Sequence, residues 1–211
     1  MNRMTGLFIG LGPILMFVVF AFLWPDVEEG LELVEALMAN QTLSTFYLLF
    51  GVLGFTMMQS GLILFSRQLI GQVSGAHAQW LTVANIGFMI SVTIIFISVS
   101  FDLGAMKLYT EGNLEQAALL SILTLHVTNA IDWSFGIGLF VLGWASMSGA
   151  LKPKSGADWL PGLLVISGAL LIIARLINNE GLGFAAWIIM MLSLVIVGAA
   201  KAFRSPEATN H

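Results

Sequence analysis

The stretch WLTVANIGFMISVTIIFISVSF, residues 80–101, decides the fold class of this chain. It contains no Asp, Glu, Lys or Arg, and it is long enough for a helix to cross the hydrocarbon core of a bilayer, which takes about 20 mostly apolar residues. A helix is the expected form, because lipid offers backbone polar groups no partner outside the segment. The stretch therefore predicts a transmembrane helix.

The composition of the whole chain agrees with a membrane protein. The 211 residues are 58% hydrophobic and 9% charged, whereas a soluble domain is roughly 25% charged. Together with residues 80–101, the chain predicts an all-α integral membrane bundle of six transmembrane helices, formed by a single domain over residues 1–204 and followed by a flexible polar tail over 205–211. The other five spans are expected at residues 6–24, 43–65, within 117–148, at 159–177 and at 183–200.

The basic residues predict how these helices are oriented. With six spans, most of the eight Lys and Arg residues fall on one side of the bilayer, and most acidic residues fall on the other. An excess of Lys and Arg marks the cytoplasmic side, so we expect both termini in the cytoplasm of a multi-pass protein in an inner or plasma membrane. The residues on that side are Arg3, Arg67, Lys152, Lys154, Lys201 and Arg204.

The segment between the first and second spans has a pattern of its own. Residues 27–39 place Leu31, Val34 and Leu37 among acidic residues that include Glu32 and Glu35. This spacing predicts a short amphipathic helix on the outer side. Because its polar face is acidic, we expect it to pack as a lid on the bundle and not on anionic lipid.

Polar side chains gather toward the outer ends of the fourth and fifth spans. Ionisable groups within spans are costly and mark candidate sites. Asp132 and Arg175 match in depth, so we expect them to form an ion pair. Three interpretations stay open: these groups tie the fourth and fifth spans together, they snorkel into the lipid headgroups, or they line a polar pocket that opens to the outer face. The candidate ligand-binding residues are His126, Asn129, Asp132, Trp133, Arg175, Asn178, Asn179 and Glu180.

Other polar and small residues predict contacts between helices. Gln59 and Asn85 both fall in the cytoplasmic half of their spans and are expected to bond to each other. Gly6 and Gly10 form a GxxxG pattern, which permits close helix approach within the chain or across a dimer. Expected partners are therefore membrane lipids and either a second copy of the chain or a larger membrane complex.

Several function classes are excluded or disfavoured. The net charge of −4 provides no basic footprint, so no nucleic acid partner is expected. The chain has no cysteine and three histidines, which fall on different sides of the bilayer, so neither a metal site nor a cofactor is expected. The sequence leaves open one further interpretation, in which His126 is the single axial ligand of a haem or pigment. No known catalytic motif appears.

The chain resembles a large bacterial family of small polytopic inner-membrane proteins of unknown function. The resemblance lies in RMTGL at residues 3–7, LH at 125–126 leading into FGIGLFVLG at 135–143, and WLPG at 159–162. It implies a bundle of six or seven helices in a bacterial inner membrane and no assigned activity. The tyrosine-rich stretch that follows the histidine in that family is absent here, so His126 is not carried over as a site residue.

These observations favour a non-enzymatic role, either binding a lipid or small apolar ligand or acting as a partner subunit in a membrane assembly. The alternative is a small secondary transporter that uses His126, Asp132 and Arg175 for recognition near the outer face. An intramembrane enzyme comes third, with His126 as general base and Asp132 orienting it.

Overall fold

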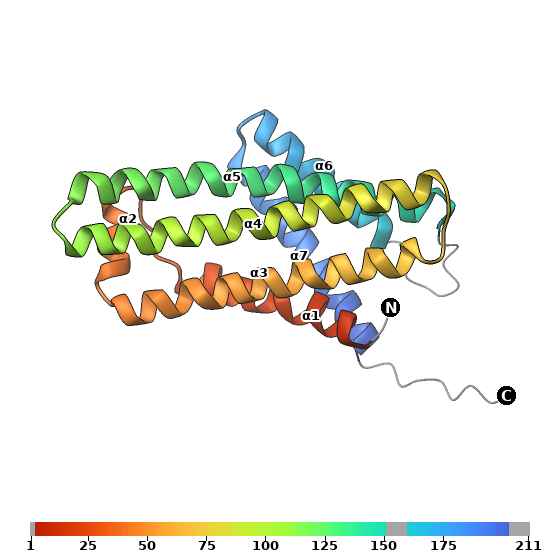
Figure 1. The fold of residues 1–211 in the computed structure, drawn as a ribbon, viewed down its shortest axis with the longest axis horizontal. Coiled ribbons are helices and arrows are strands. Elements are labelled where there is room, and N and C mark those ends of the chain that lie inside the picture. Colours follow the sequence, from red (N-terminus) through yellow and green to blue (C-terminus); the bar gives the residue numbers. More distant parts are fainter. Residues whose placement is uncertain (1–2, 151–159, 203–211) are drawn as a thin grey trace.

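A computed structural model describes residues 3–150 and 160–202, and this part of the chain is all-helical and contains no strand (Figure 1). The predicted inner loop between the fourth and fifth spans lies largely outside the described residues, and the predicted polar tail lies wholly outside them. Two π-helical turns, η1 (Val19–Leu23) and η2 (Ser146–Ala150), continue α1 and α5. The helices are α1 (Arg3–Val18), α2 (Leu31–Met38), α3 (Gln41–Ile70), α4 (Ala76–Thr110), α5 (Leu114–Ala145), α6 (Leu160–Leu176) and α7 (Glu180–Ala202).

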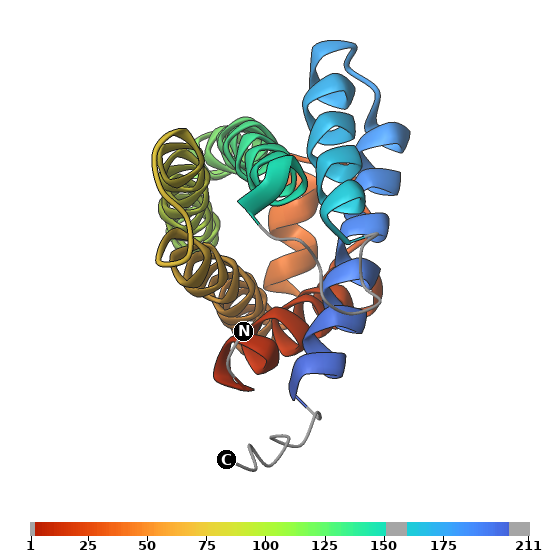
Figure 2. The same cartoon turned by 90° about the vertical axis from the view of Figure 1, so that its right-hand side faces the viewer.

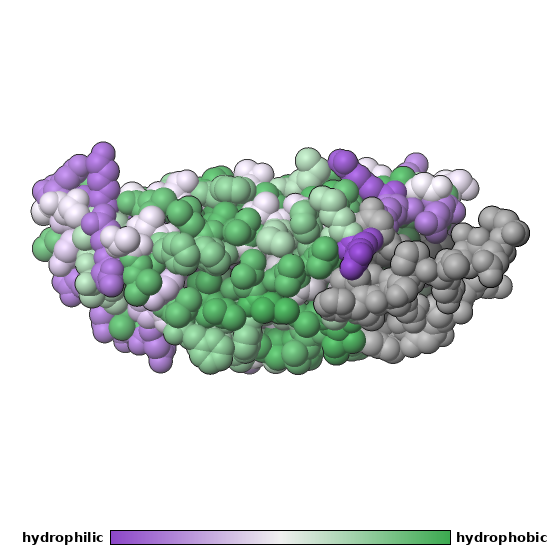
Figure 3. Space-filling view, turned by 90° about the horizontal axis from the view of Figure 1, so that it is seen from below, coloured by the Kyte–Doolittle hydropathy of each residue, from purple (hydrophilic) through white to green (hydrophobic). Residues whose placement is uncertain are grey.

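Five of these helices are long and apolar enough to cross a membrane. They are α1 with η1, α3, α4, α5 and α7, and they match five of the predicted spans. The fifth predicted span is present as α6, a shorter apolar helix of 17 residues. On the face shown in Figure 3, apolar side chains cover the middle of the molecule and hydrophilic ones gather toward its ends. The predicted all-α apolar bundle is therefore confirmed.

The helices pack in a closed order around the bundle. Contacts join α1 to α3, α3 to α4, α4 to α5, α5 to α6, α6 to α7 and α7 back to α1. Helices α3, α4 and α5 run side by side along the long axis, whereas α6 and α7 cross them steeply (Figure 2). The 35 residues of α4 make a helix of about 52 Å, well beyond the ~30 Å hydrocarbon core.

The lid helix predicted between the first two spans is present as α2. Its buried face is made of Leu33, Val34 and Leu37, whereas Leu31, which the sequence placed on that face, is only partly buried. Leu33 and Leu37 pack with Leu48 of α3 and Met106 of α4, and Val34 packs near α5. The predicted packing of this helix on the bundle is confirmed, and it covers one end of α3, α4 and α5.

The GxxxG pattern of α1 is used within the chain. A Cβ atom on Gly198 of α7 would lie 2.4 Å from the backbone nitrogen of Gly10 and 2.7 Å from the carbonyl oxygen of Gly6. Such distances are far below van der Waals contact, so only glycine lets α1 and α7 approach this closely. Of the two interpretations of this pattern, the structure supports close packing inside one chain.

The predicted bond between Gln59 and Asn85 is wrong. The Oδ1 atom of Asn85 accepts a hydrogen bond from the Ser66 hydroxyl of α3 instead. Gln59 is fully buried, and neither its amide nitrogen nor its amide oxygen has a hydrogen-bond partner among the described residues. Placing both side chains in the same half of the membrane fixes their depth but not the face of the helix on which each lies.

Candidate functional site

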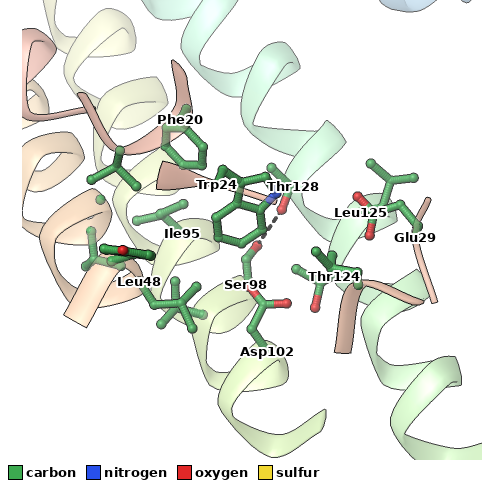
Figure 4. A pocket seen from close by; sticks show the side chains of 16 residues that line it. Phe20, Trp24, Glu29, Leu48, Ile95, Ser98, Asp102, Thr124, Leu125 and Thr128 are labelled. Atoms are coloured by element: carbon green, nitrogen blue, oxygen red, sulfur yellow. Dashed lines mark hydrogen bonds between the residues drawn. The ribbon is translucent and has the colours of Figure 1, made fainter. Parts of the chain in front are cut away.

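A cavity of about 190 Å³ lies beneath the lid helix, between η1, α3, α4 and α5 (Figure 4). Most of its wall is apolar and includes Leu33, Leu48 and Ile95. Its polar side chains come mainly from the facing sides of α4 and α5. A mostly apolar concave site with a few convergent polar groups is the usual form of a small-molecule site.

The carboxylate of Asp102 is the central polar group of this cavity. Asp102 belongs to α4, and only 4% of its surface is exposed. Asp102 faces Thr124 of α5, whose hydroxyl donates a 3.2 Å hydrogen bond to the carbonyl oxygen of Leu120. Within residues 3–150 and 160–202, the ion pairs are Lys107 with Glu111 and Arg175 with Asp132, so no described cation neutralises Asp102. A buried carboxylate without a cationic partner carries a large desolvation cost.

Hydroxyl groups extend the polar strip away from Asp102. Thr128 of α5 donates a hydrogen bond of 3.0 Å to the Ser98 hydroxyl of α4, as the dashed line in Figure 4 marks. Ser98 and Asp102 are four residues apart on α4, and Thr124 and Thr128 are four apart on α5. Because residues at this spacing share a helix face, the two pairs oppose each other across the cavity.

A second carboxylate, Glu29, lies at the rim. It precedes Gly30, whose φ of 97° suits a residue without a side chain and whose backbone N–H donates to the Ser121 hydroxyl at 3.3 Å. Partial desolvation raises the pKa of Glu29 above its ordinary value, and a hydrogen bond with Ser121 opposes that rise. Glu29 is also near enough to Asp102 for the two charges to repel. The site therefore brings two acidic side chains close together.

Aromatic rings form the side of the cavity next to η1. Phe20 and Trp24 lie against each other with ring centroids 5.7 Å apart, and Tyr47 of α3 lines the same space. Figure 4 shows the Trp24 ring beside Ser98 and Thr128. Aromatic faces attract ammonium groups through their quadrupoles. Carboxylates, hydroxyl oxygens and aromatic rings together make a site suited to a protonated amine.

The polar cluster predicted from the sequence lies outside the Asp102 cavity, since none of its residues lines that cavity. The predicted ion pair is confirmed: the Nε of Arg175 donates to Oδ2 of Asp132 at 2.6 Å. The other carboxylate oxygen accepts a 2.9 Å hydrogen bond from the indole nitrogen of Trp187 on α7. Asp132 thereby joins α5, α6 and α7, and both of its oxygens are occupied by partners within the protein. This arrangement agrees with the interpretation that the pair ties helices together.

The other predicted site residues do not converge on this pair. His126 and Trp133 are exposed on α5, and Asn129 is half-buried. Asn178, which has a φ of 50°, forms the turn between α6 and α7. The side-chain oxygen of Asn179 accepts from the backbone N–H of Leu182, so Asn179 serves the start of α7, and Glu180 lies exposed in the first helical turn. A ligand-binding role for these residues stays a prediction.

Sequence reasoning missed the Asp102 cavity and Trp187. Asp102 follows an apolar run and has the appearance of a loop acid beyond the end of a span. A usable signal was present, since Ser98 and Asp102 share one face of an extended α4. Trp187 gave no comparable signal, because a tryptophan near a span end is equally typical of an interfacial anchor.

Among the described residues, no group of three or more His, Asp or Glu side chains is arranged to hold a metal ion. Compared with protein-family models, curated proteins and solved structures, the chain has no match. The resemblance to the bacterial membrane family therefore remains an expectation.

Proposed function

We propose that this chain is a non-enzymatic membrane protein that binds a small molecule with a protonated amine in the cavity around Asp102. The observation that carries the proposal is a carboxylate with 4% exposure beside a cavity, for which no described residue supplies a cation. An ammonium group in the cavity provides the missing opposite charge. Hydrogen bonds to charged groups contribute about 1.5–3 kcal/mol each.

The cavity also discriminates by size and shape. At about 190 Å³ it lies below the ~300–1,000 Å³ of sites for drug-sized ligands, so it suits a compact head group. The hydroxyls of Ser98 and Thr128 offer acceptor lone pairs, and Trp24 and Phe20 offer aromatic faces. An ammonium head group fits the expected role in binding a lipid, but it differs from the small apolar ligand that the sequence favours.

We propose that the chain crosses a bacterial inner membrane six times and that both of its termini lie on the cytoplasmic side. The five long apolar helices, the shorter α6 and the bias of basic residues support this topology. Because the chain has no cysteine, the labelling of single introduced cysteines measures this topology directly. Glu32→Cys and Gly112→Cys are expected to react with an impermeant thiol reagent from outside, and Gln72→Cys, Ser155→Cys and Ser205→Cys only after permeabilisation. Reaction of Gln72→Cys in intact cells would contradict the topology.

The other candidate functions receive less support. A transporter that recognises its substrate at Asp132 and Arg175 has to break an ion pair and the hydrogen bond from Trp187. An enzyme with His126 as base lacks the orienting contact to Asp132, because Arg175 and Trp187 occupy that carboxylate. A role as a partner subunit is compatible with binding at Asp102 and is not an alternative to it.

The test is saturation binding of hexylammonium to the purified protein in lipid nanodiscs, with empty nanodiscs subtracted. We expect Asp102→Asn to weaken hexylammonium binding by about 10- to 100-fold, because it removes the charge that pairs with the ammonium group. Neutral 1-hexanol is expected to bind more weakly to the wild type and to be unaffected by the substitution.

Glu115→Gln is the matched control, because Glu115 is an exposed acid near the same end of α5 and does not line the cavity. It is expected to leave hexylammonium binding within about twofold of wild type, as the loss of an exposed charge has little effect at a distance. Equal affinity in Asp102→Asn and wild type, with both variants folded, would refute the proposal. So would the absence of saturable binding to the wild type.

A further inference from the structure

The Asp102 cavity lies next to a second, larger space. Phe20 lines both the Asp102 cavity and an apolar groove of about 430 Å³ between the α1–η1 segment and α7. Phe20 lies in η1, where the helix widens into a π-helical turn. Such turns are rare and frequently lie at functional sites. The two spaces are therefore neighbours that share a wall.

The groove is suited to a hydrocarbon chain. Its walls include Phe17, Ala21, Phe184, Ile188 and Met191. Trp187 also lines the groove, and its polar side-chain atom, Nε1, donates a hydrogen bond to Asp132. Phe184 is 70% exposed and Phe17 is 42% exposed, so the groove opens on the outside of the bundle. In a bilayer this opening faces acyl chains, and the unbranched methionine side chains can adapt to an irregular occupant.

The packing of α1 against α7 explains why the groove lies beside η1. The two helices touch through Gly10 and Gly198, where no side chain separates the backbones. Further along, phenylalanine and methionine side chains replace glycine at the facing positions. Because larger residues hold helix axes further apart, the space between the helices opens beside η1.

We propose that the natural ligand is a single-chain amphiphile whose ammonium head binds at Asp102 and whose alkyl tail passes Phe20 into the groove between α1 and α7. This inference rests on the proposed function and specifies its ligand class. The head group enters the acidic cavity while the tail remains in surroundings as apolar as the bilayer. Entry is lateral, from the membrane past η1, because the lid helix α2 covers the end of α3, α4 and α5.

The test compares dodecylammonium with hexylammonium in nanodiscs, using a variant that fills the groove. Ala21 is exposed and lines the groove, so Ala21→Phe is expected to occupy the path of a long tail. We expect Ala21→Phe to weaken dodecylammonium binding about tenfold or more and to leave hexylammonium within about twofold. Ala185→Phe is the matched control, since Ala185 is exposed on α7 but does not line the groove.

A second measurement locates the tail without relying on a variant. Dodecylammonium with a diazirine at the end of its chain is expected to label the α7 segment that contains Phe184, Ile188 and Met191 on irradiation. The proposal is overturned if Ala21→Phe leaves dodecylammonium binding unchanged or if labelling spreads evenly over lipid-facing helices. In either case, retained hexylammonium binding that depends on Asp102 would leave the proposed function intact. If the wild type binds neither dodecylammonium nor hexylammonium, the proposed function itself is refuted.

Discussion

Replacing Arg175 by methionine is expected to destabilise the protein by about 3–5 kcal/mol, because it leaves Asp132 buried without its cationic partner. The Asp132 side chain is 5% exposed and receives its 2.6 Å hydrogen bond from Arg175. Since the Arg175 side chain itself keeps 25% exposure, we expect the lower end of this range. Thermal unfolding in mild detergent measures the effect, which corresponds to a fall in Tm of about six degrees or more.

The double variant Asp132→Asn, Arg175→Met separates charge from packing. Asparagine retains an oxygen that accepts from Trp187 but carries no charge, so most of the lost stability is expected to return. Arg67→Met is the control for loss of an arginine at an exposed position, and its effect is expected within about 0.5 kcal/mol. If Arg175→Met is no more destabilising than Arg67→Met, the ion pair does not hold α5 and α6 together.

Gly168→Ala is expected to destabilise the contact between α5 and α6 by about 1–3 kcal/mol. A Cβ atom at position 168 would lie 2.5 Å from the carbonyl oxygen of Gly136 and 2.5 Å from the backbone nitrogen of Phe140. Both are backbone atoms of α5, so relief requires the helices to move apart. The measurement is again the midpoint of thermal unfolding, together with the yield of folded monodisperse protein.

Gly162→Ala is the matched control for this substitution. Gly162 lies on the same helix, and among the described residues a Cβ atom there would meet no heavy atom within 4 Å apart from its chain neighbours and its own helix backbone. Alanine favours a helix over glycine by up to ~1 kcal/mol, so Gly162→Ala is expected to be neutral or slightly stabilising. Equal loss of stability in the two variants would show that close approach at Gly168 is not what holds α6 in place.

Most of the fold could be predicted from the order of apolar and polar residues along the chain. Long apolar runs predict helices because lipid leaves backbone groups no other partner, and α3, α4 and α5 appear where such runs occur. The spacing of Leu31, Val34 and Leu37 among acids likewise predicts the amphipathic helix α2 and two of its three buried residues, Val34 and Leu37. Helix ends are less accessible: α4 continues to Thr110, whereas hydropathy reports only the part that matches the hydrocarbon core.

The Asp102 cavity was not predicted from the sequence, because none of the predicted site residues lines it, whereas the ion pair between Asp132 and Arg175 was. Asp132 and Arg175 could be paired because charged groups are rare in apolar runs and these two match in depth. Predicting the Asp102 cavity requires knowing which faces of α4 and α5 turn toward each other. That rotation is set by contacts between distant segments, such as Gly87 of α4 against the backbone of Ser134 on α5. Gln59 and Asn85 were mispaired for the same reason.

Direct localisation of a bound amine tests the central claim. Crystals soaked with 6-bromohexylammonium report the ligand through the anomalous signal of bromine. We predict one peak in the cavity bounded by Trp24, Leu48 and Ile95, with the ammonium density next to Asp102. A bromine peak beside Asp132 and Arg175, or an empty Asp102 cavity at saturating ligand, would contradict it.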